Sequence, residues 1–309
     1  MRGFRRRTAS AATFAVATMM ALAACTPPSG GPPGPVAQDP PIGVNGMIQD
    51  GASVWVADLF GRQLVRFSAE TGAIAERYGM DVGLCPTDDV VVLPGGDLVA
   101  TCPTEGRVIR VTRGGTATTL AEVGRGVNPI ALESSGTSVL VGFGTEDDDR
   151  LLRVPVDGGP VQTVASGLPV LNGFDIGPDG FLYVPTGGTG GILGTGGLGR
   201  IDVATGTFTQ LALSFPGQPG RSGFDFACGT DVAADGTVFV AQCFNAAAYA
   251  VDPMTGVATL VGSSPLGIAD NILVLTDGRV LVSGFFGGKV SVFTPSGGGY
   301  STSVLGIGA

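Results

Sequence analysis

The feature that most constrains the fold is a hairpin that recurs along the chain. Its clearest copy is LNGFDIGPDGFLYV, residues 171–184, in which two apolar strands flank a tight turn ending at a glycine. With the turn glycine as origin, copies follow one another at spacings of 45, 40, 44, 56 and 42 residues. The six turn glycines are Gly51, Gly96, Gly136, Gly180, Gly236 and Gly278. A sheet-like repeat of this period predicts an all-β, six-bladed β-propeller with four antiparallel strands per blade.

The composition agrees with short strands joined by many turns. The chain has 53 glycines, 21 prolines and no histidine, with 44% hydrophobic and only 14% charged residues. Residues 1–24 hold four arginines and no acidic residue, so the rest of the chain has 13 basic and 26 acidic residues, a net charge of −13. A charge of this sign opposes binding to phosphate backbones, and we expect no nucleic-acid partner.

Residues 1–24 are predicted to be a lipoprotein signal peptide. Arginines near the start precede the apolar run 11–24, which is too short and too rich in alanine for a membrane span. The run leads into LAAC, residues 22–25, which resembles the bacterial lipobox, in which the cysteine thiol receives a diacylglyceryl group. Ordinary secretion, with Cys25 as a spare thiol, is the alternative.

Residues 25–42 are predicted to be the lipidated Cys25 followed by a proline-rich tether. Residues 26–41 contain seven prolines, which favour an extended chain that cannot pack a core. We therefore expect a lipid-anchored protein of the bacterial cell envelope, on the extracytoplasmic side, with the membrane as one partner. The propeller is then expected over residues 43–309, with no obvious overlapping strand to close the ring.

Short polar side chains recur where the innermost strand of each blade is expected to begin. They stand eight residues before the turn glycine in five copies and six residues before it in the first copy. The predicted channel residues are Asn45, Asp88, Asn128, Asn172 and Asp270, with Asp89 and Asn271 beside them, whereas Cys228 takes this place in the fifth copy. Inner strands line the central channel of a propeller, so these side chains are expected to converge there.

Four cysteines after Cys25 flank two of the turns. Cys85 and Cys102 straddle the second turn, and Cys228 and Cys243 straddle the fifth. Four cysteines allow three connectivities, and the hairpin geometry favours one disulfide within each pair. A single metal site of four thiolates is the alternative, but it would have to span three blades.

Several unusual segments are expected at the channel mouth, the face where the inner strands begin. They are the acidic run 146–149, the glycine-rich insert 187–199, the loop 214–223 and the side chains Phe60, Phe244, Phe285 and Phe286. Apolar walls around converging polar groups are typical of a ligand pocket. The alternatives are that the phenylalanines wedge between blades and that the acidic run is a solvated loop tip.

The residue types limit the chemistry of such a pocket. GTGGLG, residues 194–199, matches a dinucleotide fingerprint by letter, but strands rather than a helix are expected around it. Without histidine there is no Ser-His-Asp triad and no imidazole ligand. Carboxylate and amide oxygens suit calcium, magnesium or manganese, so we expect at most one divalent cation, with Asp88, Asn172 and Asp270 as candidate ligands. A channel lined only by polar residues and water is the alternative.

LNGFDIGPDGFLYV and CGTDVAADGTVFVAQCFNAAAYAVDPMTG, residues 171–184 and 228–256, resemble repeats of the SMP-30/gluconolactonase and strictosidine synthase-like six-bladed propellers. The resemblance implies a divalent metal held by a glutamate on the first inner strand, an asparagine in an NG motif and an aspartate one blade on. Asn172 matches the asparagine, but Cys228 replaces the aspartate, and Val44 and Asn45 stand where the glutamate is expected.

The same resemblance places two further residues. Asp88 stands where the family has a substrate-contacting asparagine, and Asp270 with Asn271 is similar to the Asp-Asn pair that binds calcium in paraoxonases. Two function classes follow. The first is a lipid-anchored propeller that binds a small ligand or an envelope protein at the channel mouth. The second is a metal-dependent hydrolase of lactones or related esters. We favour the first and assign no catalytic residue.

Overall fold

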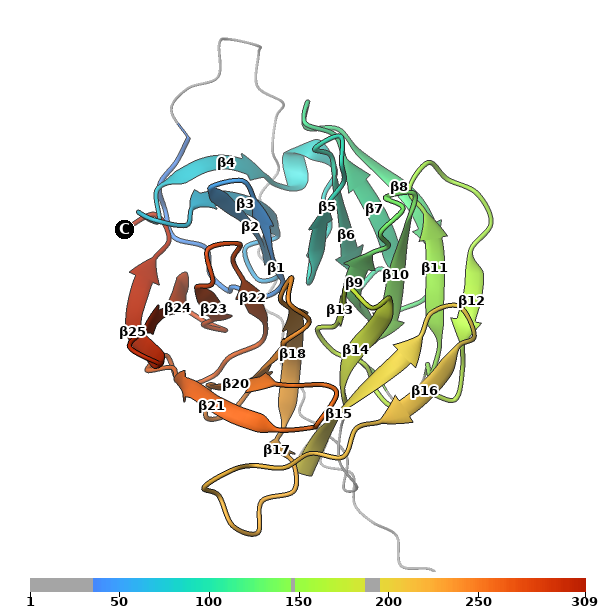
Figure 1. Cartoon of the computed structure of the whole chain (residues 1–309). Coiled ribbons are helices and arrows are strands. Elements are labelled where there is room, and N and C mark those ends of the chain that lie inside the picture. The colour runs from blue at the N-terminus through green and yellow to red at the C-terminus, as the bar shows by residue number, and fades with distance from the viewer. Residues whose placement is uncertain (1–35, 146–147, 187–194) are drawn as a thin grey trace, which may run out of the picture. The chain divides into compact units, whose positions relative to one another are not determined.

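The described part of the chain forms six antiparallel sheets arranged as blades around a central axis (Figure 1). The computed structural model describes residues 36–145, 148–186 and 195–309. The described residues therefore do not include the predicted signal peptide, Cys25 or most of the tether. They also leave out Glu146, Asp147 and residues 187–194. The predicted all-β six-bladed propeller is confirmed.

The first three blades follow in chain order, each running from its inner to its outer strand. Blade 1 consists of β1 (Met47–Asp50), β2 (Ser53–Asp58), β3 (Gln63–Ser68) and β4 (Ile74–Tyr78). A short 3-10 helix, η1 (Met80–Val82), leads to blade 2, which consists of β5 (Val90–Val92), β6 (Leu98–Cys102), β7 (Arg107–Val111) and β8 (Ala117–Glu122). Blade 3 consists of β9 (Val127–Leu132), β10 (Ser138–Phe143), β11 (Leu151–Pro155) and β12 (Gln162–Ala165).

The last three blades repeat the pattern, with one added strand. Blade 4 consists of β13 (Asp175–Ile176), β14 (Phe181–Thr186), β15 (Thr195–Asp202) and β16 (Thr207–Gln210), and β17 (Phe224–Asp225) pairs with β15. Blade 5 consists of β18 (Ala227–Val232), β19 (Val238–Gln242), β20 (Ala247–Val251) and β21 (Ala258–Ser263). Blade 6 consists of β22 (Ile272–Val274), β23 (Val280–Ser283), β24 (Lys289–Ser296) and β25 (Gly299–Gly306).

The turn glycines explain why the hairpin repeats. All six have a left-handed backbone, with φ between 64° and 88°, a conformation that side chains with a Cβ rarely adopt. Each closes the turn between the inner strand and the second strand of its blade. The strands on either side pair antiparallel, as Ile48 does with Trp55 in blade 1. The repeat in the sequence is therefore a repeat of this turn.

The hydrophobic core is divided among the blade interfaces. In the described residues, six apolar clusters form, one between each pair of neighbouring blades. Trp55 of blade 1 packs with Leu98 of blade 2, for example, and both are essentially inaccessible. Each blade therefore depends on its two neighbours to bury its faces.

Blades 1 and 6 meet without an exchanged strand in the described chain, because every sheet is built from consecutive strands. An apolar cluster that includes Val56 and Leu281 joins the two blades. The side chain of Gln49 donates a hydrogen bond to Thr276 Oγ1 at 3.1 Å and accepts one from the Thr276 backbone N–H at 2.8 Å. Packing and scattered hydrogen bonds thus close the ring.

Both predicted disulfides are present. Cys85 is bonded to Cys102 and Cys228 to Cys243, with Cα atoms 5.8 and 5.6 Å apart. The GTGGLG stretch belongs to strand β15 from Thr195 onward, not to the start of a helix, which argues against a dinucleotide site there. No helix in the described ranges is long and apolar enough to cross a membrane.

Candidate functional site at the channel mouth

Three of the predicted residues meet at one end of the central channel, and we call Asn45, Asp88 and Asp270 the mouth cluster. They come from blades 1, 2 and 6, each from the segment just before the inner strand. The side-chain nitrogen Nδ2 of Asn45 donates to Asp88 Oδ1 at 3.3 Å and to Asp270 Oδ2 at 3.2 Å. Asn45 Oδ1 is buried and has no hydrogen-bond partner among the residues that the structure describes. The cluster thus holds more acceptors than donors.

Backbone contacts bring the segments of blades 1 and 2 this close. The N–H of Gly46 donates to the carbonyl oxygen of Asp88 at 2.8 Å, and the N–H of Asn45 donates to Ala57 in β2 at 2.9 Å. A Cβ on Gly46 would lie 1.9 Å from Asp89 Oδ1. The glycine after Asn45 therefore permits the approach that sets Asn45 beside Asp88.

The electrostatics of the mouth cluster favour protonated carboxyl groups. Burial raises the pKa of Asp88 well above its usual range, and the charges of Asp270 and Asp89 raise it further. Burial raises the pKa of Asp270 to about 6, against a smaller opposing effect of its hydrogen bond from Asn45. No lysine or arginine in the described ranges forms a salt bridge with these carboxylates.

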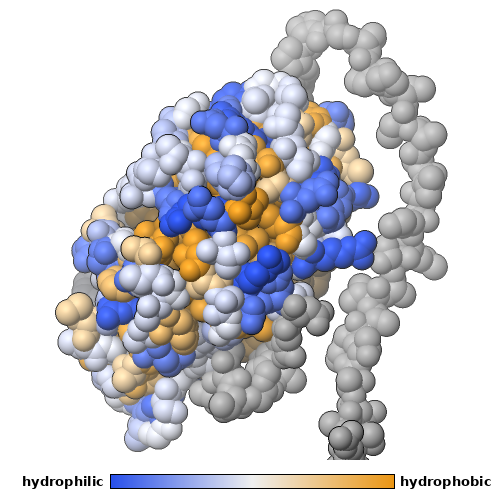
Figure 2. Space-filling view, turned by 90° about the vertical axis from the view of Figure 1, so that its right-hand side faces the viewer, coloured by the Kyte–Doolittle hydropathy of each residue, from blue (hydrophilic) through white to orange (hydrophobic). Residues whose placement is uncertain are grey.

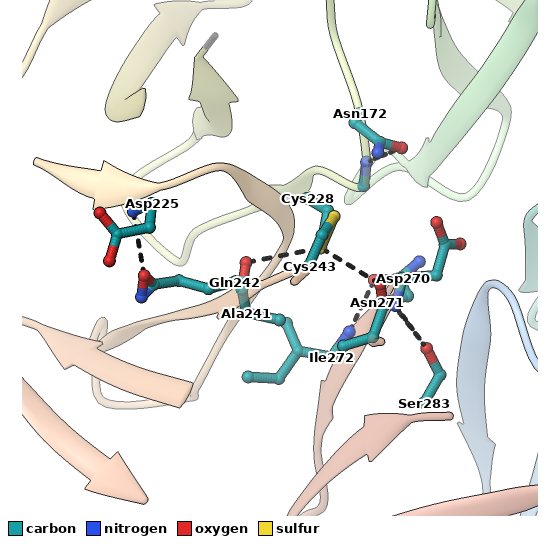
Figure 3. The surroundings of a disulfide bond; sticks show 12 residues. Asn172, Asp225, Cys228, Ala241, Gln242, Cys243, Asp270, Asn271, Ile272 and Ser283 are labelled. Atoms are coloured by element: carbon teal, nitrogen blue, oxygen red, sulfur yellow. Dashed lines mark hydrogen bonds between the residues drawn. A yellow bond between two sulfur atoms is a disulfide. The ribbon is translucent and has the colours of Figure 1, made fainter. Parts of the chain in front are cut away.

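The other two predicted asparagines do not bond to the mouth cluster. Asn172 Oδ1 accepts a hydrogen bond from the N–H of Gly173 at 3.0 Å, and Asn128 offers its backbone oxygen to Thr101 Oγ1 at 2.6 Å. Figure 3 shows Asn172 and Asp270 beside the Cys228–Cys243 disulfide. In the described ranges, no hydrogen bond joins Asn128 or Asn172 to Asp88 or Asp270.

Asp89 and Asn271, predicted beside the ring, bond to strand backbones instead. Asp89 accepts from the N–H of Val90 at 2.9 Å and from that of Ile130 in blade 3 at 3.1 Å. Asn271 Oδ1 accepts from the N–H of Ile272 at 2.8 Å. Burial raises the pKa of Asp89 to about 8, and the charges of Asp270 and Asp175 add to this effect.

Deeper in the channel lies a second group of carboxylates, Asp89, Asp175 and Asp231, which we call the deep layer. They line a cavity of about 120 Å³ to which all six inner strands contribute. Asp175 accepts from the N–H of Val232 at 3.1 Å, and Asp231 accepts from the N–H of Val274. Each of the three carboxylates thus accepts an N–H from the following blade, because the inner strand has a free edge toward the channel.

Asp175 and Asp231 also influence each other's protonation. Burial raises both pKa values, and for Asp231 the neighbouring carboxyl group of Asp175 raises the pKa further, to well above its usual range. The sequence carried one signal for this pair, since both aspartates stand five residues before a turn glycine.

Three aromatic side chains gather on one side of the mouth cluster, on turns of blades 1 and 6, and we call Phe60, Phe285 and Phe286 the aromatic rim. Their ring centroids lie 4.7 to 5.7 Å apart. Phe60 and Phe286 are 43% and 61% exposed. Phe60 lies in the β2–β3 turn and the other two in the β23–β24 turn, both on the face where the inner strands begin. On the flank shown in Figure 2, by contrast, hydrophilic residues interrupt the hydrophobic ones.

The backbone joins the rim directly to the mouth cluster. A Cβ on Gly43, two residues before Asn45, would lie 2.6 Å from the Phe60 ring. The N–H of Phe285 donates to the carbonyl oxygen of Ile268, two residues before Asp270, at 3.0 Å. Phe244 of blade 5, also predicted here, is 57% exposed and stacks on Phe226 at 5.2 Å.

The remaining predicted mouth segments contribute less. The loop 214–223 lies between β16 and β17 at the periphery of the ring (Figure 1). Of the acidic run, Asp148 pairs with Arg150 at 2.6 Å, and this hydrogen bond lowers its pKa. Glu146, Asp147 and residues 187–194 of the glycine-rich insert lie outside the described residues.

Comparison with known proteins agrees with the fold. The structure is similar to virginiamycin B lyase from Staphylococcus aureus, at a TM-score of 0.62 and 13% identity over 88% of this chain and 86% of that one. It is also similar to the gluconolactonase XC5397 from Xanthomonas campestris (0.61, 18%, 79% and 84%) and to a calcium-binding regucalcin from Agrobacterium tumefaciens (0.58, 14%, 79% and 83%). These similarities show the fold alone. No family model and no curated protein matches the sequence.

The metal site of the resembled lactonases does not fit these residues. Cys228, at the position of their aspartate, is bonded to Cys243 and offers no thiolate. In the described ranges, no three acidic or cysteine side chains are placed to hold a metal ion together.

Proposed function

We propose that the chain is a lipid-anchored envelope protein whose propeller binds a small ligand at the channel mouth. One observation carries the proposal: an incompletely paired cluster of two carboxylates and an amide lies close to the exposed side chains of Phe60 and Phe286. Convergent polar groups beside apolar walls are the usual make-up of a ligand site. The lipobox-like LAAC sequence supports the anchor, and the two disulfides agree with an oxidising compartment.

The anchor is tested by labelling cells with radioactive palmitate. The full-length chain should incorporate the label, Cys25→Ala should not, and the neighbouring control Ser29→Ala should behave as the unchanged chain. Label retained by Cys25→Ala would contradict lipidation at this residue.

A metal-dependent hydrolase of lactones remains the second candidate. It is favoured by the match of Asn172 to an asparagine ligand of the resembled family and by the two carboxylates of the mouth cluster. The test measures hydrolysis of glucono-δ-lactone by the purified chain with added calcium, magnesium or manganese. We expect no rate above that of the metal alone. Hydrolysis that Asn172→Ala abolishes would replace the binding function by the enzymatic one.

A further inference from the structure

We infer that the propeller docks on the membrane that holds its lipid anchor, through exposed apolar side chains on the mouth face, the face where the inner strands begin. The inference rests on the lipid anchor of the proposed function and names the surface that meets the bilayer. The apolar side chains enter the headgroup region of an anionic bilayer, and two basic side chains beside them bond to lipid phosphates. We call the apolar set the docking patch: Ile42, Phe60, Phe244, Ile268 and Phe286.

Exposed apolar side chains are unevenly divided between the two faces of the ring. In the described ranges, eleven large hydrophobic side chains are exposed. Six of them lie on connections at the mouth face, whereas two, Val161 and Met254, lie on connections at the opposite face. Five of the six belong to blades 5, 6 and 1, which are neighbours in the ring (Figure 1), and these five form the docking patch. Exposed apolar surface gathered in this way marks a docking site.

Backbone contacts hold the blade 1 and blade 6 parts of the patch together. The N–H of Gly287 donates to the carbonyl oxygen of Ile42 at 3.0 Å, and the Phe60 ring stacks on Phe286 with centroids 5.7 Å apart. The buried carboxylate of Asp58, two residues before Phe60, accepts the N–H of Ile42 at 3.0 Å. The backbone that carries Ile42 and Phe60 is thus fixed before the protein meets a membrane.

The blade 5 part joins the patch through the segment before β22. The N–H of Phe285 donates to the carbonyl oxygen of Ile268 at 3.0 Å, and the N–H of Ala269 donates to that of Cys243 at 2.8 Å. Phe244, the next residue, is 57% exposed, and Ile268 is 42% exposed. The docking patch is therefore continuous from blade 5 to blade 1. The mouth connections of blades 2, 3 and 4 lie outside it and would stay in water.

Two basic side chains lie beside the patch. Arg62 is in the turn of Phe60, and Lys289, the only lysine of the chain, follows Phe286 by three residues; both are exposed. Eight arginines in the described ranges form salt bridges, but Arg62 and Lys289 form none there. The chain after residue 24 has a net charge of −13, so an anionic bilayer repels most of its surface. The two cations therefore select the face that approaches the lipid phosphates.

The tether identifies a lipid surface as the partner of the patch. It enters the propeller along the patch, since a Cβ on Gly288 would lie 2.8 Å from Pro40. Val36, where the described chain begins, is eleven residues after the predicted lipid site at Cys25, and eleven extended residues span at most about 40 Å. The bilayer is thus held within reach of the patch, which favours it over a partner free in solution. Aromatic and aliphatic side chains beside arginine and lysine are also typical of surfaces that lie among lipid headgroups.

The test uses the single tryptophan of the chain, Trp55, which is fully buried and serves as a constant background. The lipidated full chain is placed in vesicles of phosphatidylethanolamine and phosphatidylglycerol that contain brominated phospholipid, a contact quencher of tryptophan. Phe286→Trp adds an indole to the patch, and the control Met254→Trp adds one on the opposite face, where Met254 is 85% exposed. We expect quenching of at least about half of the added emission of Phe286→Trp, because side chains docked in this way reach the headgroup–acyl boundary. The added emission of Met254→Trp should be almost unaffected.

The same assay measures the contribution of charge. Phosphatidylcholine in place of phosphatidylglycerol should lower the quenching of Phe286→Trp. Arg62→Gln and Lys289→Gln, each added to Phe286→Trp, should lower the ratio of docked to undocked molecules about fivefold, since a cation near an anionic surface adds affinity on this scale. Arg113→Gln, which removes a cation from a turn at the opposite face, should leave the ratio unchanged.

Thermal melts of every variant establish that it folds, and Phe60→Trp takes the place of Phe286→Trp if the latter does not fold. Equal quenching of the patch variant and Met254→Trp, or quenching of neither, would overturn the docking and leave the anchor standing, because the palmitate label reports lipidation separately. Quenching that is the same in phosphatidylcholine vesicles would overturn the assignment to an anionic surface. Absence of the palmitate label from the unchanged chain, by contrast, would overturn the proposed anchor itself.

Discussion

Asp270 at the channel mouth and Asp231 in the deep layer are both carboxylates near the axis, but their partners differ. Asp270 is partly exposed and bonds to one side-chain amide, that of Asn45. Asp231 accepts backbone N–H groups from Val232 at 3.0 Å and from Val274 in the next blade. A side-chain partner can be exchanged for a ligand, whereas a backbone N–H on the free edge of an inner strand needs an acceptor that the neighbouring blade fixes in place. The deep layer is therefore structural, and the mouth cluster is free to bind.

The largest effect is expected from removing a carboxylate of the deep layer. Asp231→Ala leaves the N–H group of Val274 without its acceptor, while the N–H of Val232 keeps Asp175, and this should lower the free energy of unfolding by about 2 kcal/mol. Asp270→Ala should lower it by less than about 1 kcal/mol, because the one partner of its carboxylate in the described part of the chain is a side chain. Urea denaturation of both variants measures the two losses. Equal losses would remove the distinction between the layers.

An intermediate effect is expected from pH. The folded chain keeps the Asp89 proton up to about pH 8, whereas the unfolded chain releases it near the ordinary value of 3.8. The pKa values of Asp88, Asp175, Asp231 and Asp270 are raised in the same direction. The unfolded state therefore binds fewer protons between these limits, and stability must fall as pH rises through this window.

The measurement is a set of thermal melts between pH 5 and pH 8. The Tm should be higher at pH 5 by about 5 °C or more. The lower limit avoids the surface carboxylates with lowered pKa, such as Asp148 and Asp277, whose contribution is lost at more acid pH. Asp89→Asn should make the Tm depend less on pH. A Tm that rises from pH 5 to pH 8 would contradict the raised pKa values of these buried carboxyl groups.

The smallest effect is expected at the mouth cluster without ligand. Asp88→Asn removes the repulsion between Asp88 and Asp270, so at pH 8 the free energy of unfolding should rise by about 1 kcal/mol. At pH 5, where the raised pKa values keep these groups mainly protonated, the change should vanish. Urea denaturation at the two pH values makes the comparison. Destabilisation at both would place Asp88 with the structural carboxylates.

The fold and part of the mouth were predictable because the turn glycine fixes a register. Counting from Gly96 or Gly278 gives the height of Asp88 or Asp270 in the channel, and the antiparallel hairpin gives the cysteine pairs. Register does not fix the direction of a side chain. Asn172 shares the register, but its side chain bonds to Gly173. Asn128 lies inside β9. Neither residue therefore belongs to the mouth cluster.

The deep layer was not predictable for a related reason. Its members stand at two different offsets from the turn glycine, seven residues for Asp89 and five for Asp175 and Asp231. They are defined by the N–H groups that they accept from the next blade, which depend on how neighbouring blades are placed. No local pattern in one repeat carries that information.

The closure of the ring without an exchanged strand has a mechanical consequence. Asn45 belongs to the first blade and Asp270 to the last, so the mouth cluster straddles the junction at which, in the described chain, no covalent connection joins the two blades. A molecule bound there would hold blades 1 and 6 together. Pulling the ring apart at this junction would then require the ligand to leave first, so occupancy of the mouth cluster would set how readily the ring opens.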